Sequence, residues 1–345
     1  MIFRQLFDSV SSTYSYILAS RKGGEALIID PVLEKVDRYI QLFDELNVKL
    51  VKAIDTHLHA DHITGLGALR DRTLCVTVMG EQTKADVVSM RVSDGDTVDI
   101  KGLQLGVIYT PGHTDDSYSF TLHDRVFTGD TLLIRGTGRT DFQNGDARVQ
   151  YESIFNRLLK LPDDTLVYPA HDYKGETVST IAEERAFNPR LQVKTVDEYV
   201  DLMSKLDLPD PKMMDIAVPA NVRVGLSQDE VAKRGWALKA PELASQLNRT
   251  DVAIVDLRED RERSKYGEIP GSVHVSYNSF TNALKPGGVL RKLGSTKSLV
   301  FYCAFGERSA MAVQRAREAG LASARHLEGG FSEWQKAEDH APWAK

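Results

Sequence analysis

The sequence predicts an α/β protein built from two domains, and three observations support this prediction. The chain has 345 residues, which is more than one hydrophobic core usually holds. Short apolar runs typical of strands recur in both halves, separated by turns and by segments of helical periodicity. Between the halves, residues 207–225 carry three prolines and little periodicity, which is typical of a connecting segment.

The first half is predicted to contain several strands and an amphipathic helix. An apolar run over residues 25–31 ends at a proline and predicts a strand, and a second strand over 49–55 runs directly into a cluster of histidines. Residues 34–47 predict a helix, because they place five apolar side chains on one helical face: Val36, Tyr39, Ile40, Phe43 and Leu46. Further strands are predicted over 103–110, 117–122, 125–130 and 165–170.

The second half predicts a small α/β domain with a mostly parallel sheet, because short strands alternate with helices. One helix is predicted from a serine to a glycine over 309–320, and a last amphipathic helix over 331–338. Strands are predicted over 252–259, 267–277, 297–303 and 324–329.

Composition and charge narrow the choice of partners and compartment. Basic residues number 43 and acidic residues 49, so the net charge of −6 favours neither nucleic acid nor an anionic membrane as a partner. Two cysteines, Cys75 and Cys303, fall in different predicted domains and indicate a reducing compartment without a disulfide framework. The first 18 residues lack signal-peptide features, and no apolar stretch approaches the roughly 20 residues of a membrane span. We therefore expect a cytoplasmic protein, and the sequence is compatible with a homo-oligomer.

Histidines and aspartates gather after the predicted strands of the first half. The stretch THLHADH follows one strand directly, and PGHT, GDTL and PAHDY follow three others. Neutral imidazole nitrogens and carboxylate oxygens suit transition metals, so these motifs predict a metal site. We expect His123, His326 and His340 to be ordinary surface or core residues. The candidate ligands are His57, His59, Asp61, His62, His113, Asp130 and His171.

In this order and spacing, the four motifs resemble those of the metallo-β-lactamase superfamily. The resemblance implies an αββα sandwich that gathers metal ligands along one edge. Within that superfamily, LIRGTGRTDFQNGD at 133–146, YPAHDYKGETVSTIAEERAFNPRL at 168–191 and VPANVR at 218–223 are similar to the persulfide dioxygenase family. The similarity covers nearly all of residues 1–225, which we predict to be the first domain.

Two ligand sets are implied by this resemblance. Hydrolases of the superfamily commonly hold two metals, here His57, His59 and His113 for the first, Asp61, His62 and His171 for the second, and Asp130 between them. A glyoxalase II type thioester hydrolase therefore remains an alternative. The persulfide dioxygenase resemblance implies one Fe(II) per chain on His57, His113 and Asp130, with His59, Asp61, His62 and His171 around them. Two histidines and a carboxylate leave positions open for sulfur and dioxygen, whereas zinc has no redox chemistry.

The substrate implied by the resemblance is glutathione persulfide, which is oxidised to sulfite and glutathione. Its carboxylates need positive partners, and an arginine can bind a carboxylate through two parallel hydrogen bonds. Alternatively, Arg139 pairs with a neighbouring aspartate. The residues at matching family positions are Arg139, Tyr173, Asn221 and Arg223.

The stretch FYCAFGERSAMA at 301–312 places Cys303 where a buried strand meets a turn and a helix start. Backbone N–H groups of the turn, the helix dipole and Arg308 are expected to stabilise a negative sulfur there. Cys75 has no such surroundings and is expected to be a buried core thiol.

The C-terminal part resembles a single rhodanese domain. IVDLRED, GEIPGSVHV and CAFGER match its motifs, and the six residues from Cys303 to Arg308 fit a sulfurtransferase loop. We predict this domain over 236–345 after a linker over 226–235, and we expect His274 to be structural. The resemblance implies that Cys303 carries sulfane sulfur from thiosulfate or glutathione persulfide to an acceptor thiol. A noncatalytic docking or sulfur-sensing module is the alternative.

Overall fold

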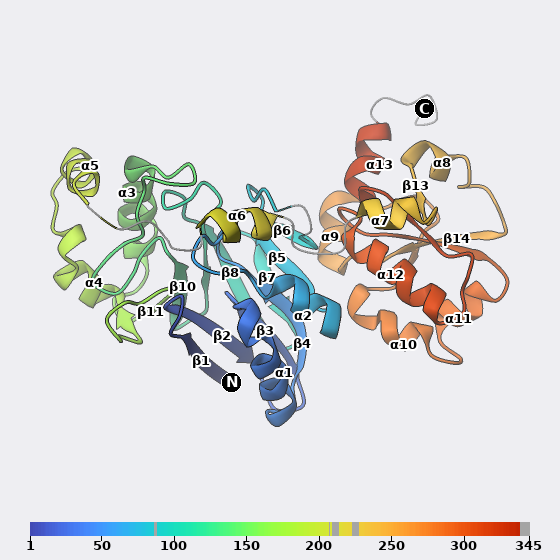
Figure 1. Cartoon of the computed structure of the whole chain (residues 1–345), viewed down its shortest axis with the longest axis horizontal. Helices are drawn as coiled ribbons and strands as arrows, with labels where there is room; N and C mark the ends of the chain where they lie inside the picture. Colours follow the sequence, from blue (N-terminus) through green and yellow to red (C-terminus); the bar gives the residue numbers. More distant parts are fainter. Residues whose placement is uncertain (86–87, 207, 209–213, 223–227, 339–345) are drawn as a thin grey trace. The chain divides into compact units, whose positions relative to one another are not determined.

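The computed structural model describes residues 1–85, 88–206, 208, 214–222 and 228–338, and the chain divides into two compact units (Figure 1). The first unit comprises residues 1–86 and 91–224, and the second comprises 87–90 and 225–345. This division lies next to the boundary predicted at residue 225, and the exact domain limits remain a prediction.

Two six-stranded sheets form the centre of the first unit. They face each other through aromatic side chains: the ring of Tyr16 lies 5.0 Å from that of Phe127 and 5.6 Å from that of Tyr168. The hydroxyl of Tyr16 also donates to the carbonyl of Pro169 at 2.6 Å. One sheet contains, in order, β1 (Ile2–Asp8), β2 (Thr13–Ala19), β3 (Glu25–Ile29), β4 (Lys49–Ile54), β5 (Val76–Gly80) and β6 (Met90–Val92). The other contains β12 (Ser179–Thr180), β11 (Leu166–Pro169), β10 (Arg125–Gly129), β9 (Tyr118–Thr121), β8 (Leu103–Tyr109) and β7 (Thr97–Ile100).

Helices cover the outer faces of both sheets, so the first unit is the αββα sandwich that the resemblance implied (Figure 1). On the first sheet, α1 (Val36–Glu45) and α2 (Leu66–Thr73) pack against β4. On the second, α3 (Ala147–Asn156), α4 (Ile181–Phe187) and α5 (Val196–Ser204) share a core with β10 and β11. This core contains Val126, Ile154, Val167, Ile181 and Tyr199. A further helix, α6, spans Met214–Val222.

The second unit is built on a five-stranded sheet in the order β13-β17-β16-β14-β15, in which every pairing is parallel. This confirms the mostly parallel sheet expected from the sequence. The strands are β13 (Ala237–Leu238), β14 (Val252–Asp256), β15 (Val273–His274), β16 (Ser298–Tyr302) and β17 (Arg325–Leu327). The helices are α7 (Gln228–Lys233), α8 (Ala240–Ala244), α9 (Asp260–Tyr266), α10 (Phe280–Leu284), α11 (Val289–Gly294), α12 (Glu307–Glu318) and α13 (Gly330–Glu338).

Several local expectations need correction. In α1, Leu42 is buried with Val36, Tyr39 and Phe43, whereas the predicted Ile40 and Leu46 are only partly buried. The helix expected to begin at Ser309 begins two residues earlier, because Gly306 takes a left-handed φ of 91° and acts as the cap. The strand expected over 267–277 is reduced to the two residues of β15.

The connecting segment contains helices that the sequence pattern did not indicate. The helix α6 has apolar residues around most of its circumference and an internal Pro219, so it shows no amphipathic period. The helix α7 lies within the predicted linker 226–235. Residues 2–8 and 13–19, for which the sequence pattern predicted no strand, form the hairpin of β1 and β2.

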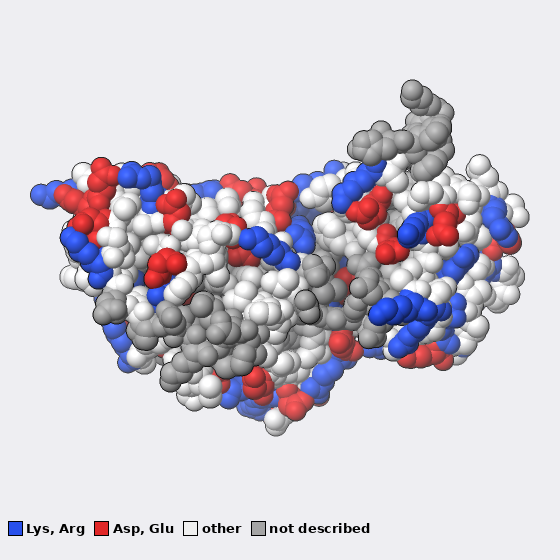
Figure 2. Space-filling model, turned by 45° about the horizontal axis from the view of Figure 1, so that its top comes forward, with Lys and Arg blue, Asp and Glu red and all other residues white. Residues whose placement is uncertain are grey.

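On the face drawn in Figure 2, acidic and basic side chains are interspersed over both units, in agreement with the mixed composition. None of the helices in the described part of the chain combines the length and the apolar character that a bilayer span needs.

Candidate functional site

The predicted metal ligands meet at one edge of the first unit, each shortly after the end of a strand. The histidine loop follows β4, and the other three motifs follow β8, β10 and β11. Because β3, β4 and β5 are parallel in one sheet and β10 and β11 in the other, their carboxyl ends share an edge. Ring contacts link the groups: the imidazole of His57 lies 4.2 Å from that of His59 and 5.0 Å from that of His113.

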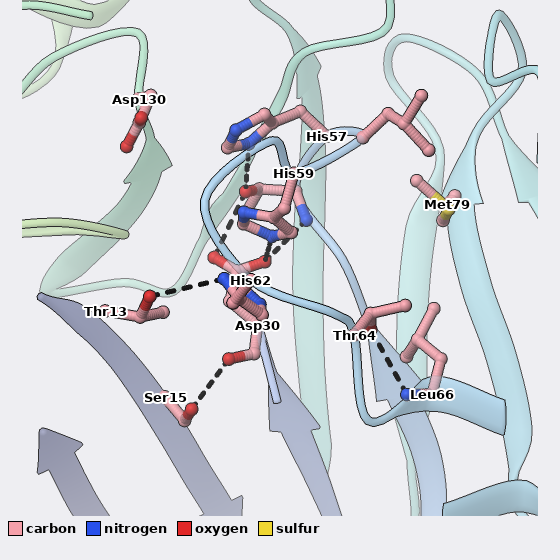
Figure 3. A network of polar contacts seen from close by, with 12 residues as sticks. Thr13, Ser15, Asp30, His57, His59, His62, Thr64, Leu66, Met79 and Asp130 are labelled. Carbon is pink, nitrogen blue, oxygen red and sulfur yellow. Dashed lines mark hydrogen bonds and ion pairs between the residues drawn. The ribbon is translucent and has the colours of Figure 1, made fainter. Parts of the chain in front are cut away.

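His57 presents a nitrogen lone pair whose direction is set by its neighbours. The hydroxyl of Thr56 donates to Oδ2 of Asp30 at 3.1 Å, so its oxygen accepts from Nδ1 of His57 at 2.9 Å (Figure 3). Nε2 then carries the lone pair. Burial lowers the pKa of His57 well below its usual value, so the ring is neutral, as a metal ligand must be.

His113 and Asp130 complete a three-residue group. Nδ1 of His113 donates to the carbonyl of Arg139 at 2.7 Å, and since a carbonyl can only accept, Nε2 carries the lone pair. That nitrogen lies 3.6 Å from Oδ2 of Asp130. Burial raises the pKa of Asp130, but the charge and the hydrogen bond of His171 outweigh it and hold the pKa well below its usual range.

The residues around Asp61 form a group with different chemistry. Oδ2 of Asp61 accepts from Nδ1 of His62 at 2.8 Å and from Nε2 of His171 at 2.7 Å. Nδ1 of His171 donates to Oδ1 of Asp130 at 2.6 Å. Burial alone lowers the pKa of His171, but the two carboxylates outweigh it and hold the pKa well above its usual value. Both ring nitrogens of His171 therefore donate, and neither offers a lone pair to a metal.

Three groups in the described part of the chain have ligand atoms within 4.8 Å of one another, and they differ in how well they suit a metal. His57, His113 and Asp130 provide two imidazole nitrogens and one carboxylate, and the other nitrogen of each ring is already hydrogen-bonded. In the other two groups, most ligand atoms are hydrogen-bonded to one another; one group is His59, Asp61, His62 and His171, and the other is Asp30, Asp55 and His59. Within the described residues, Nδ1 of His59 and Nε2 of His62 are buried without a hydrogen-bond partner, so two atoms could serve a second metal.

The predicted substrate residues have specific contacts of their own. Nε and Nη2 of Arg139 both donate to Asp141 at 2.7 Å, which is the pairing considered as its alternative role. Tyr173 is 70% exposed, and its ring stacks on that of His171 at 6.2 Å. Arg223 lies outside the described residues. Substrate binding by these residues remains a prediction.

Asn221 on α6 holds the histidine loop through its side-chain amide. Nδ2 donates to the carbonyls of His59 at 3.0 Å and His62 at 2.8 Å, and Oδ1 accepts from the backbone N–H of Thr64 at 2.9 Å. The side chain is buried, so all three bonds are shielded from water. The structure therefore gives Asn221 a role in shaping the loop that sequence reasoning did not foresee.

In the second unit, Cys303 follows β16 and is fully buried. Its Sγ accepts from the backbone N–H of Gly306 at 3.2 Å, just before α12 begins. The start of α13 closes the same loop, because Phe331 donates its N–H to the carbonyl of Cys303 at 2.7 Å and Ser332 to that of Ala304 at 3.0 Å. A thiol beside a turn N–H and a helix N-terminus is placed where a negative sulfur is stabilised.

Arg308 is fully buried, and its guanidinium is paired chiefly with a carboxylate. Nη1 and Nη2 donate to the two oxygens of Glu262 at 2.8 and 2.6 Å. Burial lowers the pKa of Arg308, but Glu262 outweighs it, and Cys303 is among the groups that raise it further. The arginine therefore contributes positive charge near the thiol from a fixed position.

The other described histidines take surface or structural positions, as expected. His123 has a side chain 85% exposed, and Nε2 of His274 donates to the carbonyl of Arg258 at 2.8 Å. His326 is a core residue, fully buried beside the cysteine loop, where Nδ1 lies 3.3 Å from Oγ of Ser309. Its position on a short strand of the same parallel sheet was the only signal in the sequence.

Comparison with known families agrees with this geometry. Residues 9–171 match the metallo-beta-lactamase superfamily, and residues 239–337 match the rhodanese-like domain. A metallo-beta-lactamase structure from Staphylococcus aureus has a TM-score of 0.61, covers 95% of this chain and 98% of that chain, and is 22% identical, which supports the fold alone. The protein is thus a metal enzyme of the metallo-β-lactamase fold joined to a rhodanese domain, and its His/Asp group implies a bound metal ion.

More specific relatives narrow the class. Human mitochondrial persulfide dioxygenase ETHE1 is 46% identical over 229 residues, 66% of this chain and 89% of the relative, and the mouse protein gives the same values. The crystal structure of ETHE1 from Myxococcus xanthus is 54% identical, with a TM-score of 0.63 over 64% of this chain and 98% of that one. The chain belongs to the persulfide dioxygenase family and carries a C-terminal rhodanese sulfurtransferase domain.

We expect Gly138→Ala to weaken metal binding by about tenfold or more, in the range found when groups that orient ligands are lost. A Cβ at this position would lie 2.2 Å from the carbonyl oxygen of Asp130 and 2.8 Å from the ring of His113, so both must move. Gly136→Ala is the matched control, because its nearest neighbour is Leu133 Cβ at 3.8 Å. Chelator competition on the folded proteins measures the effect, and equal affinities for the two variants would contradict the ligand assignment.

We expect Asn221→Ala to lower the free energy of unfolding by about 1–3 kcal/mol, because buried backbone groups of the histidine loop lose their partners. Denaturant unfolding of the full chain measures this change. If Asn221 acted on substrate instead, the KM for glutathione persulfide would rise while the unfolding free energy stayed the same.

Proposed function

We propose that this enzyme oxidises glutathione persulfide with dioxygen to sulfite and glutathione, using one Fe(II) per chain on His57, His113 and Asp130. We further propose that Cys303 transfers sulfane sulfur from thiosulfate or glutathione persulfide to a thiol. Family membership supports persulfides and related sulfur compounds as substrates, since the relatives named above are persulfide dioxygenases.

The observation that carries the first proposal is the contrast between two neighbouring groups. In one, Thr56 and Arg139 set the tautomers of His57 and His113 so that both Nε2 lone pairs are available beside Asp130. In the other, both nitrogens of His171 already donate to carboxylates. This contrast supports placing the proposed iron on the first group, whose imidazole lone pairs are oriented by hydrogen bonds on the opposite ring nitrogens.

A ferrous ion on two histidines and one carboxylate would supply the redox chemistry that joins dioxygen to the persulfide sulfur. The overall reaction consumes one persulfide, one dioxygen and one water, and releases glutathione, sulfite and two protons. His171 holds Asp130 by a hydrogen bond at 2.6 Å, so the carboxylate keeps its orientation. Tyr173 and Arg139 flank this region and are proposed to bind the glutathione part.

For sulfur transfer, the loop from Cys303 to Gly306 supplies the nucleophile and a backbone donor. The thiolate of Cys303 attacks the outer sulfur of thiosulfate, the S–S bond breaks, and sulfite leaves with the bonding electrons. The resulting cysteine persulfide then passes its outer sulfur to an acceptor thiol. Both proposed reactions handle glutathione persulfide and sulfite, which accounts for their presence in one chain.

A cytoplasmic location remains part of this proposal, together with a homo-oligomer as a compatible assembly. The human, mouse and bovine relatives are named as mitochondrial, which describes those proteins. To find the direction of sulfur flow between the two reactions, the rates of oxygen uptake and of sulfur transfer would be measured on the same substrate and compared.

We expect His113→Ala to lose the iron and His62→Ala to retain about one iron per chain, because only His113 belongs to the proposed ligand set. Metal analysis of the purified variants and oxygen uptake with glutathione persulfide measure the two effects. Two metals per wild-type chain, lost one at a time in these variants and accompanied by thioesterase activity, would support the glyoxalase II alternative.

We expect Cys303→Ala to abolish thiosulfate-dependent sulfur transfer and to leave oxygen uptake unchanged. Cys75→Ala serves as the control, because Cys75 is a buried thiol in the first unit, next to β5. Mass spectrometry of the thiosulfate-treated wild type should show one added sulfur on Cys303. If the wild type takes up none, the rhodanese domain is the noncatalytic module considered above.

A further inference from the structure

A buried polar chain connects His326 to the sulfur of Cys303 through one hydroxyl group. Oγ of Ser309 lies 3.7 Å from Sγ of Cys303 and 3.3 Å from Nδ1 of His326, and it donates to the carbonyl of Gly306 at 3.0 Å. Cys303, Ser309 and His326 are all fully buried. The chain joins three elements, since Cys303 follows β16, Ser309 lies in α12 and His326 lies in β17.

The proton on His326 belongs on Nδ1. Within the described residues, Nε2 of His326 is buried without a hydrogen-bond partner. A buried N–H without an acceptor costs more than a lone pair without a donor, so the tautomer with Nδ1–H is favoured. Burial also lowers the pKa of His326 to about 4, so the ring is neutral near pH 7 and carries a single N–H. In this tautomer Nδ1 can donate to the oxygen of Ser309 at 3.3 Å, and the backbone of Leu327 and Gly306 also interacts with the ring.

This arrangement leaves the hydroxyl proton of Ser309 free to change partner. When Cys303 is a thiol, its S–H donates to Oγ of Ser309, and the hydroxyl of Ser309 donates to the carbonyl of Gly306. With a negatively charged sulfur, the same hydroxyl can rotate and donate to it. Nδ1–H of His326 donates to the same oxygen in both states, which holds the hydroxyl beside Sγ and strengthens its O–H as a donor.

We propose that His326 is a positioning residue of the sulfur-transfer site, which holds Ser309 so that its hydroxyl donates to the Cys303 sulfur in the thiolate and persulfide states. The inference deepens the proposed sulfur transfer and rests on Cys303 as the carrier. The negative charge resides on Cys303 before the attack on thiosulfate and on the outer sulfur afterwards. A donor held beside Sγ therefore stabilises the Cys303 thiolate in both steps. In the first step this thiolate is the nucleophile, and in the second it is the leaving group when the acceptor thiol takes the outer sulfur.

Two substitutions at His326 separate hydrogen bonding from packing in the full chain. The side-chain amide of Asn can place an N–H near the position of Nδ1, whereas the longer Gln places it near Nε2. We expect His326→Gln to slow both alkylation of Cys303 by iodoacetamide at pH 7 and thiosulfate-dependent sulfur transfer by about tenfold, in line with loss of a charge-assisted hydrogen bond. His326→Asn should retain both rates within about twofold of the wild type, which a purely structural role does not predict.

Ser309→Ala tests the same chain from its middle. It should slow both reactions by about tenfold, and adding His326→Gln should cause no further loss, because the two residues act through one hydroxyl. Equal rates for wild type and His326→Gln, or multiplying losses in the double variant, would overturn the proposal. Thermal melting identifies variants that fail to fold, and the Ser309→Ala and His326→Asn rates then decide the outcome.

The two readouts also keep this inference distinct from the proposed function. A wild type that transfers no sulfur would refute sulfur transfer, while the alkylation rates would still test the link from His326 to Cys303. Conversely, if the wild type transfers sulfur and both His326 variants transfer it at the same rate, only the role of His326 is refuted.

Discussion

The buried carboxylate of Asp30 is the interaction on which the metal-binding edge depends. It accepts from the backbone N–H of Thr56 at 2.7 Å, from the Thr56 hydroxyl at 3.1 Å and from Nε2 of His59 at 3.2 Å (Figure 3). The backbone of Asp30 is held as well, because Ser15 donates to its carbonyl at 2.6 Å. One buried residue, through its carboxylate and its backbone carbonyl, thus joins β2, the end of β3 and the loop after β4.

The chemistry of the ligands follows from this anchor. Because the hydroxyl of Thr56 donates a hydrogen bond to Asp30, its oxygen can only accept from His57. Asp30 therefore determines, through Thr56, which nitrogen of His57 carries the lone pair for a metal. The carbonyl of Arg139 does the same for His113 from the other sheet. Facing sheets therefore contribute one oriented histidine each, and Asp130 lies beside them.

The sulfur site of the second unit uses the same physical means with different groups. A parallel strand ends just before the reactive residue, a helix begins after a left-handed glycine, and the backbone N–H of that glycine donates to the sulfur. The charge of Arg308 is balanced by Glu262, and the side chain that contacts Sγ is the neutral hydroxyl of Ser309, which in turn contacts His326. Placing neutral donors next to a buried anion avoids a second unpaired charge.

The sequence by itself determined the two-domain α/β organisation, the strand ends that carry chemistry and the residue types of both sites. These follow from local rules: apolar runs, turn residues and motif spacing depend on neighbours along the chain. Other elements could not be recognised from irregular local patterns, such as the mostly apolar α6 and the helix α7 within the expected linker.

The roles of the individual candidate residues depend on contacts that form only in the folded chain. Long-range packing places His171 between two carboxylates and His326 beside the cysteine loop. It also brings Asn221 to the histidine loop, although Asn221 lies 162 residues from His59 in the sequence. The physical reason is that a histidine can be ligand, cation or hydrogen-bond donor, and the choice is made by burial and by partners that the chain brings together only when folded.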